Sequence, residues 1–520
     1  MNRADSHAPI NPWLIAIAVM ISTFMEVLDT TVVNVSLPHI AGSLSATVDE
    51  ATWVLTSYLV ANAIVLPITG WLAGRFGRKN LLMASVTGFT CASFLCGLAP
   101  TLPLLICFRM LQGLCGGALQ PLSQAVLLEA FPPQDRGKAM GFWGLGIVVA
   151  PVIGPVLGGW LTDSYSWRWV FYINIPVGVA AILMTRAFVF DPPYLRQSGG
   201  KIDYWGIGLL AVWIGALQIV LDKGQEADWF GSSWIVLLSA IGAVFLILFL
   251  FREIWAGDPV VNLRVFKYRT YSVGVLLMTV VGFLLYGSLV LLPIWLQTLL
   301  GYPSTQAGLA LAPRGMGSMV SMPIVGALTS RIDPRKLLGT GLIVGAGTTF
   351  GFAHLNLNAG YWDLFWPQFV QGLSLGLIFV PLTTITMSPV PKQNMGNATS
   401  IFNLMRNIGG SIGIAMVDTF YARFQQTHIN NLVVHAMPGE GRYARLFDSF
   451  RSLFLSQGSG PGLADQQSTA TLFGLVERQA SMLSFIQVFH ILTVMFLALA
   501  PFVLLMRRPS GSAESGTMAH

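Results

Sequence analysis

Charged residues are scarce in this chain of 520 residues, where Asp, Glu, Lys and Arg make up 10% and hydrophobic residues 54%. An ordinary soluble protein carries about 25% charged residues, so the polar surface that a water-soluble enzyme needs is missing. The formal net charge of +6 does not indicate nucleic-acid binding, because the basic residues are scattered between apolar runs. The composition therefore predicts a polytopic membrane protein, with the lipid bilayer and no nucleic acid as its partner.

Cysteine is also scarce. The four cysteines, Cys91, Cys96, Cys107 and Cys115, lie within apolar runs and have neither a disulfide framework nor a metal-ligand spacing. The chain has no Gly-x4-Gly-Lys-Ser/Thr phosphate loop, which argues against a nucleotide-driven pump. No His-Glu-x-x-His motif of a metalloprotease is present either. We therefore expect no metal and no bound cofactor.

The long apolar runs favour helices over a membrane barrel, because they are continuous and do not alternate with polar residues. A span needs about 20 apolar residues. Fourteen ranges meet this expectation: 13–36, 51–73, 80–99, 103–128, 139–161, 167–187, 204–221, 233–251, 271–297, 305–329, 337–356, 362–388, 397–419 and 484–506. The first range contains Glu26 and Asp29 and is followed by no small-residue cleavage site, so we expect a retained helix and not a signal peptide.

The distribution of Lys and Arg between the runs predicts the orientation in the membrane. With the N-terminus in the cytoplasm, nineteen basic residues fall in cytoplasmic segments and two, Arg168 and Lys223, in short external loops. Basic residues concentrate on the cytoplasmic side of membrane proteins. The pattern predicts cytoplasmic tails at 1–12 and 507–520.

An internal repeat predicts the domain organisation. Residues 67–75 share five of nine identities with residues 323–331, at an offset of 256, and Gln112-Gly113-Leu114 recurs as Gln371-Gly372-Leu373, at an offset of 259. We interpret this as two six-helix halves, 13–190 and 270–506, with an inserted helix pair at 203–252. Duplicated halves are typical of transporters whose substrate site lies between them near the middle of the membrane.

Two acids and one arginine within the apolar runs are candidate proton-coupling residues. Glu26 and Asp29 are three residues apart and share a helix face, and two adjacent carboxylates raise each other's proton affinity. Arg109 lies about 9 Å from the external end of its helix and Asp29 about 13 Å from the same end, at 1.5 Å per residue. An interaction between Asp29 and Arg109 is therefore feasible.

Four motifs carry a resemblance to a known family. They are Leu-Asp-Thr-Thr-Val-Val-Asn-Val-Ser-Leu-Pro at 28–38, Gly-Trp-Leu-Ala-Gly-Arg-Phe-Gly-Arg-Lys at 70–79, Arg-Met-Leu-Gln-Gly at 109–113 and Gly-Pro-Val-Leu-Gly-Gly at 154–159. The chain resembles the major facilitator superfamily, and within it the fourteen-helix drug–proton antiporters of the EmrB/QacA type. One departure is Gly74, where the family pattern usually has an aspartate.

The resemblance implies a proton-coupled exporter of hydrophobic or amphipathic compounds in the bacterial cytoplasmic (inner) membrane, driven by the proton gradient. It assigns proton coupling to Asp29, Glu26 and Arg109. The residues it places at a cavity for small-molecule substrates are Asn34, Gln112, Phe283, Tyr286, Arg314, Gln368 and Phe369. The gating and antiporter motifs contain Gly70, Arg75, Gly77, Arg78, Lys79, Gly154, Pro155, Gly158, Gly159 and Arg406.

Three alternatives stay open at this point. An exporter of fatty acids or another anionic metabolite would use Arg109, Arg314 and Arg406 to bind anions. An intramembrane enzyme is the second alternative and does not account for the repeat. A non-transporting sensor is the third, and the absence of proton-linked flux would distinguish it. The polar segment 421–483 is expected outside the cell, either as a docking site for a periplasmic adaptor protein that leads to an outer-membrane channel or as a flexible loop.

Overall fold

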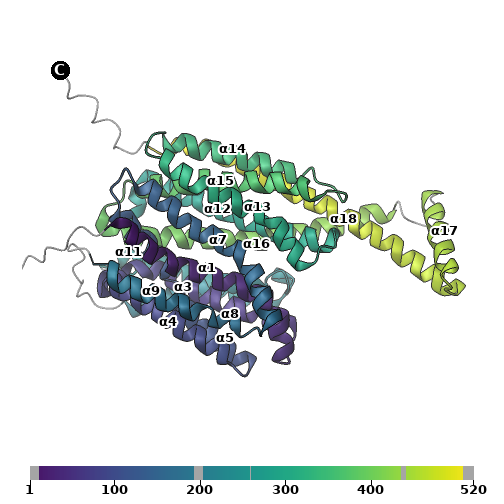
Figure 1. Ribbon diagram of the computed structural model, residues 1–520, viewed down its shortest axis with the longest axis horizontal. Coiled ribbons are helices and arrows are strands. Elements are labelled where there is room, and N and C mark those ends of the chain that lie inside the picture. The colour runs from purple at the N-terminus through teal and green to yellow at the C-terminus, as the bar shows by residue number, and fades with distance from the viewer. Residues whose placement is uncertain (1–10, 192–202, 258, 435–440, 508–520) are drawn as a thin grey trace, which may run out of the picture.

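The computed structural model describes residues 11–191, 203–257, 259–434 and 441–507, and all regular structure in these ranges is helical (Figure 1). Most of the predicted tails 1–12 and 507–520 lies outside the described residues. The helices of more than ten residues are α1 (Pro12–Ser43), α3 (Trp53–Phe76), α4 (Arg78–Leu98), α5 (Leu102–Gly116), α6 (Leu119–Ala130), α7 (Arg136–Ser164), α9 (Asn174–Phe188), α10 (Tyr204–Lys223), α11 (Ser233–Trp255), α12 (Arg269–Ile294), α13 (Ser304–Leu328), α14 (Pro334–Phe352), α15 (Tyr361–Met387), α16 (Met395–Val433), α17 (Gly441–Ser456) and α18 (Pro461–Leu499). Shorter elements are α2 (Val48–Ala51), α8 (Trp169–Tyr172), η1 (Trp229–Gly231), η2 (Leu263–Lys267), η3 (Trp295–Leu299), η4 (Lys392–Asn394) and η6 (Ala500–Leu505).

A helix lies over each of the fourteen predicted ranges. Within the described part of the chain, eleven helical segments are long and apolar enough to cross a membrane. The other three, α13, α14 and α16, contain several glycines and polar residues and pack against neighbouring helices. The predicted all-helical, multi-span class is confirmed, whereas the number of fourteen spans stays a prediction.

Three predicted ranges differ from the helices in the structure, although 103–128 still lies within one segment that is long and apolar enough to cross a membrane. The range 103–128 is broken at Gly117 and Ala118 into α5 and α6, where two consecutive glycines precede Pro121. Glycine weakens a helix and proline lacks the amide donor. The ranges 397–419 and 484–506 are much shorter than α16 and α18, which contain 39 residues each.

The long helices α16 and α18 also correct the flexible-loop interpretation of 421–483. α16 continues to Val433, α17 follows, and α18 begins at Pro461. Figure 1 shows α18 running beyond the bundle on the right, with α17 across its outer end. These segments are rich in Ala, Leu, Gln and Arg, which favour a helix even outside the membrane. Hydropathy marks where the apolar layer ends and not where the helix ends.

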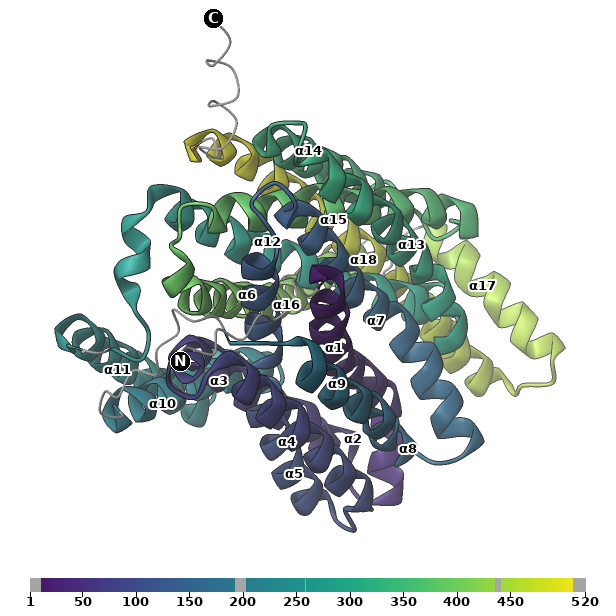
Figure 2. The same ribbon diagram turned by 60° about the vertical axis from the view of Figure 1, so that its left-hand side comes forward.

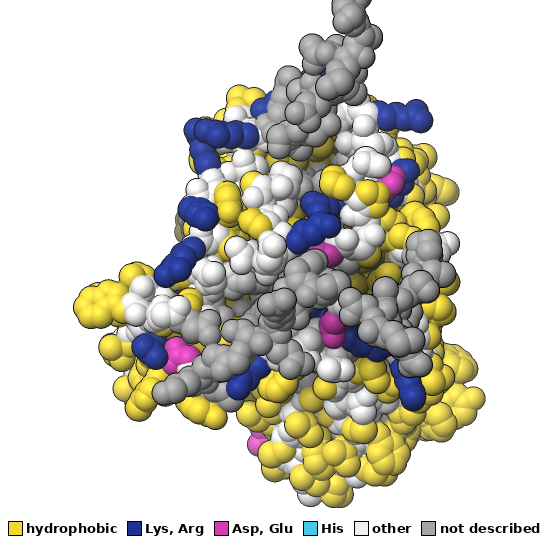
Figure 3. Space-filling view, turned by 90° about the vertical axis from the view of Figure 1, so that its left-hand side faces the viewer, with side chains coloured by type: hydrophobic (Ala, Val, Ile, Leu, Met, Phe, Trp, Pro, Cys, Tyr) yellow, Lys and Arg dark blue, Asp and Glu magenta, His cyan; other side chains and the backbone are white. Residues whose placement is uncertain are grey.

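The long helices form two bundles. In the N-terminal bundle, α1 packs on α7, α9 and α6, and α3 and α4 pack on α5; in the C-terminal bundle, α12 packs on α16, and α15 on α13 and α14. Lys and Arg side chains gather on the end of the molecule that faces the viewer in Figure 3, where α1 begins in Figure 1. We call it the basic end; α17 lies at the opposite end.

The two bundles approach each other most closely at the basic end. Gly137 and Gly141 of α7 lie against Gly326 and Met322 of α13, so closely that a Cβ on either α7 glycine would overlap α13. Gly70 of α3 lies in the same way against the backbone of Gly396 and Asn397 at the start of α16. Toward the opposite end, α7 and α13 are separated by an apolar groove of about 540 Å³.

The inserted helices α10 and α11 lie at the edge of the bundle beside α3 (Figure 2). α10 contacts both bundles. Gln218 on α10 donates to Ser411 on α16 at 2.9 Å, and Lys223 donates to Thr52 next to α3 at 2.6 Å. The inserted pair therefore joins α3 and α16 from outside.

Gly70→Val tests the close approach of α3 to α16. We expect it to lower the free energy of unfolding by about 1–3 kcal/mol, the usual cost of overpacking, because a side chain at Gly70 overlaps the α16 backbone. Gly74→Val is the matched control, since no atom lies within 4 Å of a Cβ one turn later on the same helix. Thermal unfolding of both purified variants measures the difference, and equal melting temperatures would contradict the contact.

Candidate functional site

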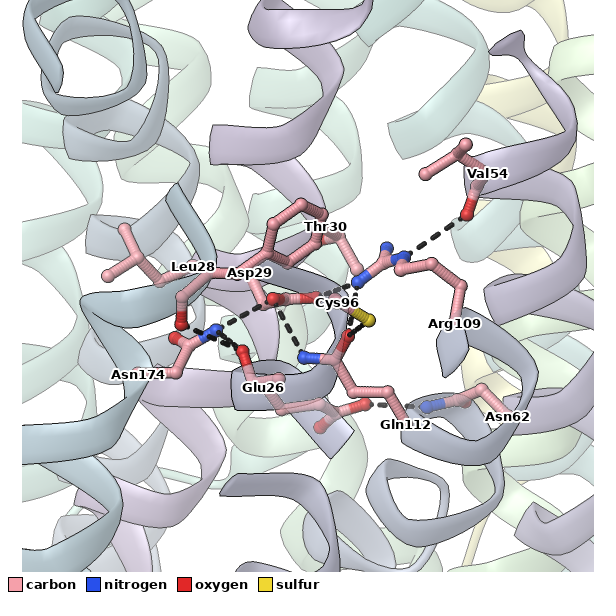
Figure 4. A network of polar contacts seen from close by, with 12 residues as sticks. Glu26, Leu28, Asp29, Thr30, Val54, Asn62, Cys96, Arg109, Gln112 and Asn174 are labelled. Carbon is pink, nitrogen blue, oxygen red and sulfur yellow. Dashed lines mark hydrogen bonds and ion pairs between the residues drawn. The ribbon is translucent and has the colours of Figure 1, made fainter. Parts of the chain in front are cut away.

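A buried network of hydrogen bonds surrounds Asp29 in the N-terminal bundle (Figure 4). Its Oδ2 accepts from the Arg109 guanidinium at 2.5 Å. Its Oδ1 accepts from the Gln112 amide at 3.0 Å and from the Asn174 amide at 2.7 Å. The side chains come from α1, α5 and α9, so the interaction that the sequence made feasible is present, and Gln112 belongs to this network.

Arg109 is fully buried and held on several sides. Its Nε donates to the Val54 carbonyl at 3.1 Å, and one terminal nitrogen also donates to the Gln112 side-chain oxygen at 2.8 Å. Its guanidinium carbon lies 4.2 Å from the centre of the Tyr58 ring and 5.7 Å from that of Phe171. Aromatic faces attract a desolvated cation. The other terminal nitrogen has no hydrogen-bond partner among the residues that the structure describes.

Neither charge of this pair touches solvent, since both side chains have 0% exposure. Removing two ions from water is costly, and their mutual attraction compensates only when the remaining donors and acceptors are satisfied. Gln112 and Asn174 provide that satisfaction for Asp29. Neutralising either side chain would therefore leave the other charge buried without an ionic partner.

Glu26 lies one helical turn before Asp29 but outside the Asp29 network. One of its oxygens accepts from the Asn62 amide of α3 at 2.9 Å, and the Gln120 side chain of α6 is a further polar neighbour. The side chain is buried, and Arg406 of α16 is among the charges that act on it. The two acids on α1 thus have separate hydrogen-bond partners within the N-terminal bundle, and Glu26 also lies in the field of Arg406 of the other bundle.

Polar side chains bridge the bundles close to Glu26. Arg406 of α16 donates to the Gln120 side chain of α6, and Asn403, one turn earlier, donates to Gln124 at 2.6 Å. The Arg406 guanidinium also lies 5.9 Å from the Phe379 ring. Arg406 therefore lies at the contact between α16 and α6.

The glycine-rich motif of α7 packs against α1 beside Asp29. A Cβ on Gly154 would overlap the Thr31 side chain, and one on Gly158 would press on the backbone of Val32. Gly159 is less constrained, and Pro155 is half-buried inside the helix. Only a glycine allows α7 this close to α1 at the first two positions.

The motif at 70–79 is stabilised by acids that sequence reasoning missed. Gly77 has φ +85°, a left-handed conformation that favours glycine, and the following amides of Arg78 and Lys79 donate to Asp191 at 2.6 and 3.0 Å. Arg78 forms a buried ion pair with Glu129. Acids from elsewhere in the chain thus contact this motif, while position 74 is Gly.

Three further residues of the motifs have contacts at or near this end. Lys79 donates to the Arg186 carbonyl at 2.7 Å. The Arg75 guanidinium lies 5.8 Å from the centre of the Trp71 ring. Gly70 forms the contact with α16 described above. The segment therefore joins α3, α4, α9 and α16.

The predicted cavity residues do not form one group. Asn34 is exposed on α1 and lies apart from the Asp29 network. Phe283 is buried, Tyr286 packs against Gly410 of α16, and Phe369 stacks on Phe365. Arg314 and Gln368 are buried in the C-terminal bundle.

Sequence reasoning missed the neutral partners of the acids. Asn62 holds Glu26, Asn174 holds Asp29, and the Tyr58 ring covers Arg109. The available signal was the presence of an amide in an otherwise apolar stretch of α3 and at the start of α9. Among the described residues, no group of His, Cys, Asp or Glu could hold a metal ion.

Apolar helices around a buried ion pair are the arrangement of a membrane transporter. A family profile described as Major Facilitator Superfamily matches residues 19–414. The chain belongs to this superfamily, and it is a transporter rather than an intramembrane enzyme. With its apolar helices and bacterial relatives, it is a multi-pass protein of the bacterial inner membrane.

Two relatives match nearly the whole chain. The multidrug export protein EmrB of Escherichia coli K12 is 37% identical over 508 residues, 98% of each chain. The fatty acid resistance protein FarB of Neisseria gonorrhoeae is 37% identical over 505 residues, 96% of this chain and 97% of FarB. These similarities agree with the resemblance to EmrB-type proteins.

Solved structures support the fold. A double tryptophan mutant of XylE has a TM-score of 0.62 and 14% identity, covering 96% of this chain and 97% of that chain. The human organic anion transporter MFSD10 has a TM-score of 0.58 and 13% identity, covering 93% and 99%. At such identities the likeness concerns the fold alone.

A double-mutant cycle tests the Asp29–Arg109 pair. Asp29→Leu or Arg109→Met alone should each reduce the free energy of unfolding by about 3–5 kcal/mol, because each leaves one buried charge unpaired. The double variant should be more stable than either single variant, since it buries no charge at this place. Thermal unfolding in detergent provides the comparison, and additive losses would mean that the pair is not coupled.

Proposed function

We propose that the chain is a proton-coupled exporter that moves hydrophobic or amphipathic compounds out across the cytoplasmic membrane by alternating access. The observation that carries the proposal is the Asp29–Arg109 pair, fully buried between apolar helices. Ionisable groups at such depth are costly and mark ion or substrate pathways. Relatives named for multidrug export support the direction and the kind of substrate.

Protonation of Asp29 is the proposed coupling step. The charged carboxylate attracts Arg109 and accepts from Gln112 and Asn174, and so connects α1 to α5 and α9. A proton would remove this attraction and leave Arg109 without its anion, which favours a different packing of the three helices. Each proton that enters contributes roughly 2.3 kcal/mol per 100 mV of membrane potential.

Glu26 is the proposed second proton acceptor. Its side chain is buried beside Asn62 and Gln120, and Arg406 of the other bundle lies within electrostatic range. Its protonation would therefore alter the attraction between the bundles, while protonation of Asp29 acts within one bundle.

In the proposed conformational change, the two bundles rock relative to each other. We assign fourteen spans, with both termini and the basic end in the cytoplasm, halves at 13–190 and 270–506, and the inserted pair at 203–252. Contact at the basic end and a groove at the opposite end support an outward-facing arrangement. Glycine packing of α7 on α1 would transmit changes at Asp29 to the α7–α13 contact.

Asp29→Asn in proteoliposomes with an imposed pH gradient tests the coupling. The amide has nearly the shape of the carboxylate but carries no charge and no exchangeable proton at neutral pH. The substrates measured are ethidium, tetraphenylphosphonium or a neutral lipophilic dye. In the wild type the pH gradient should drive their flux, and in Asp29→Asn the flux should fall to the level of empty liposomes.

The matched control is Asp163→Asn, because Asp163 is a solvent-exposed acid at the end of α7. It should transport like the wild type. Gradient-driven flux in Asp29→Asn at the wild-type rate would overturn the coupling role of Asp29.

The helices beyond the bundle are proposed to dock a periplasmic adaptor protein, which would lead the substrate to an outer-membrane channel. α17 packs on α18 and leaves Leu446 and Leu453, two turns apart on one face, each 48% exposed. Apolar side chains on a helix away from the bilayer support a protein contact.

Leu446→Glu with Leu453→Glu tests the adaptor site, and Ser452→Glu on another face of α17 is its control. The double variant should retain flux in proteoliposomes, where no adaptor is present, and lose resistance in cells. Resistance equal to that of the control would argue against docking at this face.

A further inference from the structure

The C-terminal end of the inserted helix α10 contacts the beginning of α3. Asp222 accepts from the Thr56 hydroxyl, and Lys223 donates to the Thr52 hydroxyl at 2.6 Å. Lys223 is buried, with 5% exposure, and also pairs with Glu226 at 2.8 Å. Two adjacent charged side chains of α10 thus hold both hydroxyls at the start of α3.

The same turn of α3 holds Arg109. Val54 lies between the two threonines, and its carbonyl accepts from Arg109 Nε at 3.1 Å. The ring of Tyr58, one turn later on α3, has its centre 4.2 Å from the guanidinium carbon. Buried polar groups keep hydrogen-bond partners, and Arg109 has 0% exposure. The position of Arg109 therefore depends on the position of the first turn of α3.

α10 and the short helix η1 that follows it are also attached to α16 of the other bundle. Gln218 donates to Ser411 at 2.9 Å and accepts from the same hydroxyl at 3.1 Å. The Trp229 indole donates to Thr419 at 3.0 Å. Trp229 has φ +48° and Asp228 φ +56°, a left-handed conformation that is uncommon outside glycine. Such strain persists only where the surrounding structure fixes it, so the hairpin after α10 is held firmly against α16.

The internal repeat shows that this arrangement belongs to one half. At the offset of 256, Thr52 and Thr56 correspond to positions 308 and 312, which are Gly and Ala. At the offset of 259, Arg109 corresponds to Gln368. The hydroxyls that α10 contacts are thus found in the half that carries the paired arginine.

From these contacts we infer that Asp222 and Lys223 are positioning residues for Arg109, through which α10 adjusts the Asp29–Arg109 pair to the position of α16. When the bundles rock, α16 moves relative to α3. Because α10 binds both helices, it transmits that movement to the turn that holds Arg109. The inference rests on the proposed export function and gives the inserted helix pair a part in its coupling.

Two measurements on the full chain in proteoliposomes test this role. One is ethidium flux driven by an imposed pH gradient. The other is exchange of radiolabelled for unlabelled ethidium at equal pH, which needs no proton. The ratio of the first rate to the second measures coupling, whereas a loss of stability lowers both rates and leaves the ratio unchanged.

Asp222→Leu and Lys223→Met should each lower the ratio about 10-fold, the effect of losing one hydrogen bond that involves a charged group, while exchange at equal pH continues. Thr56→Val should lower the ratio as well, and Thr56→Ser, which retains the hydroxyl that Asp222 accepts from, should keep it. Trp229→Phe retains an aromatic ring but loses the indole donor to α16, so it should also lower the ratio.

Trp234→Phe is the matched control for Trp229→Phe, because Trp234 is exposed on α11 of the same inserted pair; its ratio should equal that of the wild type. Wild-type ratios in Asp222→Leu, Lys223→Met and Thr56→Val would overturn the positioning role even with gradient-driven export intact. If Asp222→Leu fails to fold, the comparison of Thr56→Val with Thr56→Ser decides. A wild-type ratio in Trp229→Phe would contradict the link to α16. Wild-type protein without gradient-driven flux would instead remove the export function on which the inference rests.

Discussion

The cost of placing a charge between apolar helices governs this structure. In an interior of low dielectric constant, an ion is stable only when an opposite charge and enough hydrogen-bonding groups surround it. Asp29 and Arg109 satisfy this requirement with help from Gln112 and Asn174. Because these side chains belong to α1, α5 and α9, the electrostatic balance also determines how the three helices pack.

Close helix contacts convert that local change into a larger one. α7 lies against α1 through Gly154 and Gly158, and its other end lies against α13 through Gly137 and Gly141. One helix, α7, therefore contacts both the segment beside Asp29 and the opposite bundle. α10 joins α3 to α16 on a different side of the molecule. The bundles are thus joined through α10 on one side, while a groove separates α7 from α13 on another.

The residues that could be predicted from the sequence are those whose burial costs the most free energy. An ionisable group in an apolar run is costly and usually functional, which singles out Asp29, Glu26 and Arg109. Asn62 and Asn174 could not be singled out, since one amide in a helix costs little and many such residues only pack. Two acids contact the motif at 70–79, namely Asp191 and Glu129. Both are distant from it in sequence, and no local pattern connects them to it.

Helix ends were predictable only where the membrane sets them. Hydropathy located the apolar centres of α16 and α18, but both helices continue into regions where water replaces lipid and helix propensity alone decides. The break between α5 and α6 has the opposite cause, because an apolar run conceals a local weakness at two glycines and a proline. Hydropathy thus indicates which part of a helix lies among apolar surroundings more reliably than it indicates how long the helix is.

Arg109, Arg406 and Arg314 are all buried, and each has different neighbours. Arg109 is paired with Asp29 inside one bundle. Arg406 donates across the bundle contact to Gln120, so its environment changes when the bundles separate. Arg314 has a hydroxyl where Arg109 has a carboxylate. The surrounding helices thus decide whether a buried guanidinium is paired with an acid, bridges the two bundles or donates to a neutral hydroxyl.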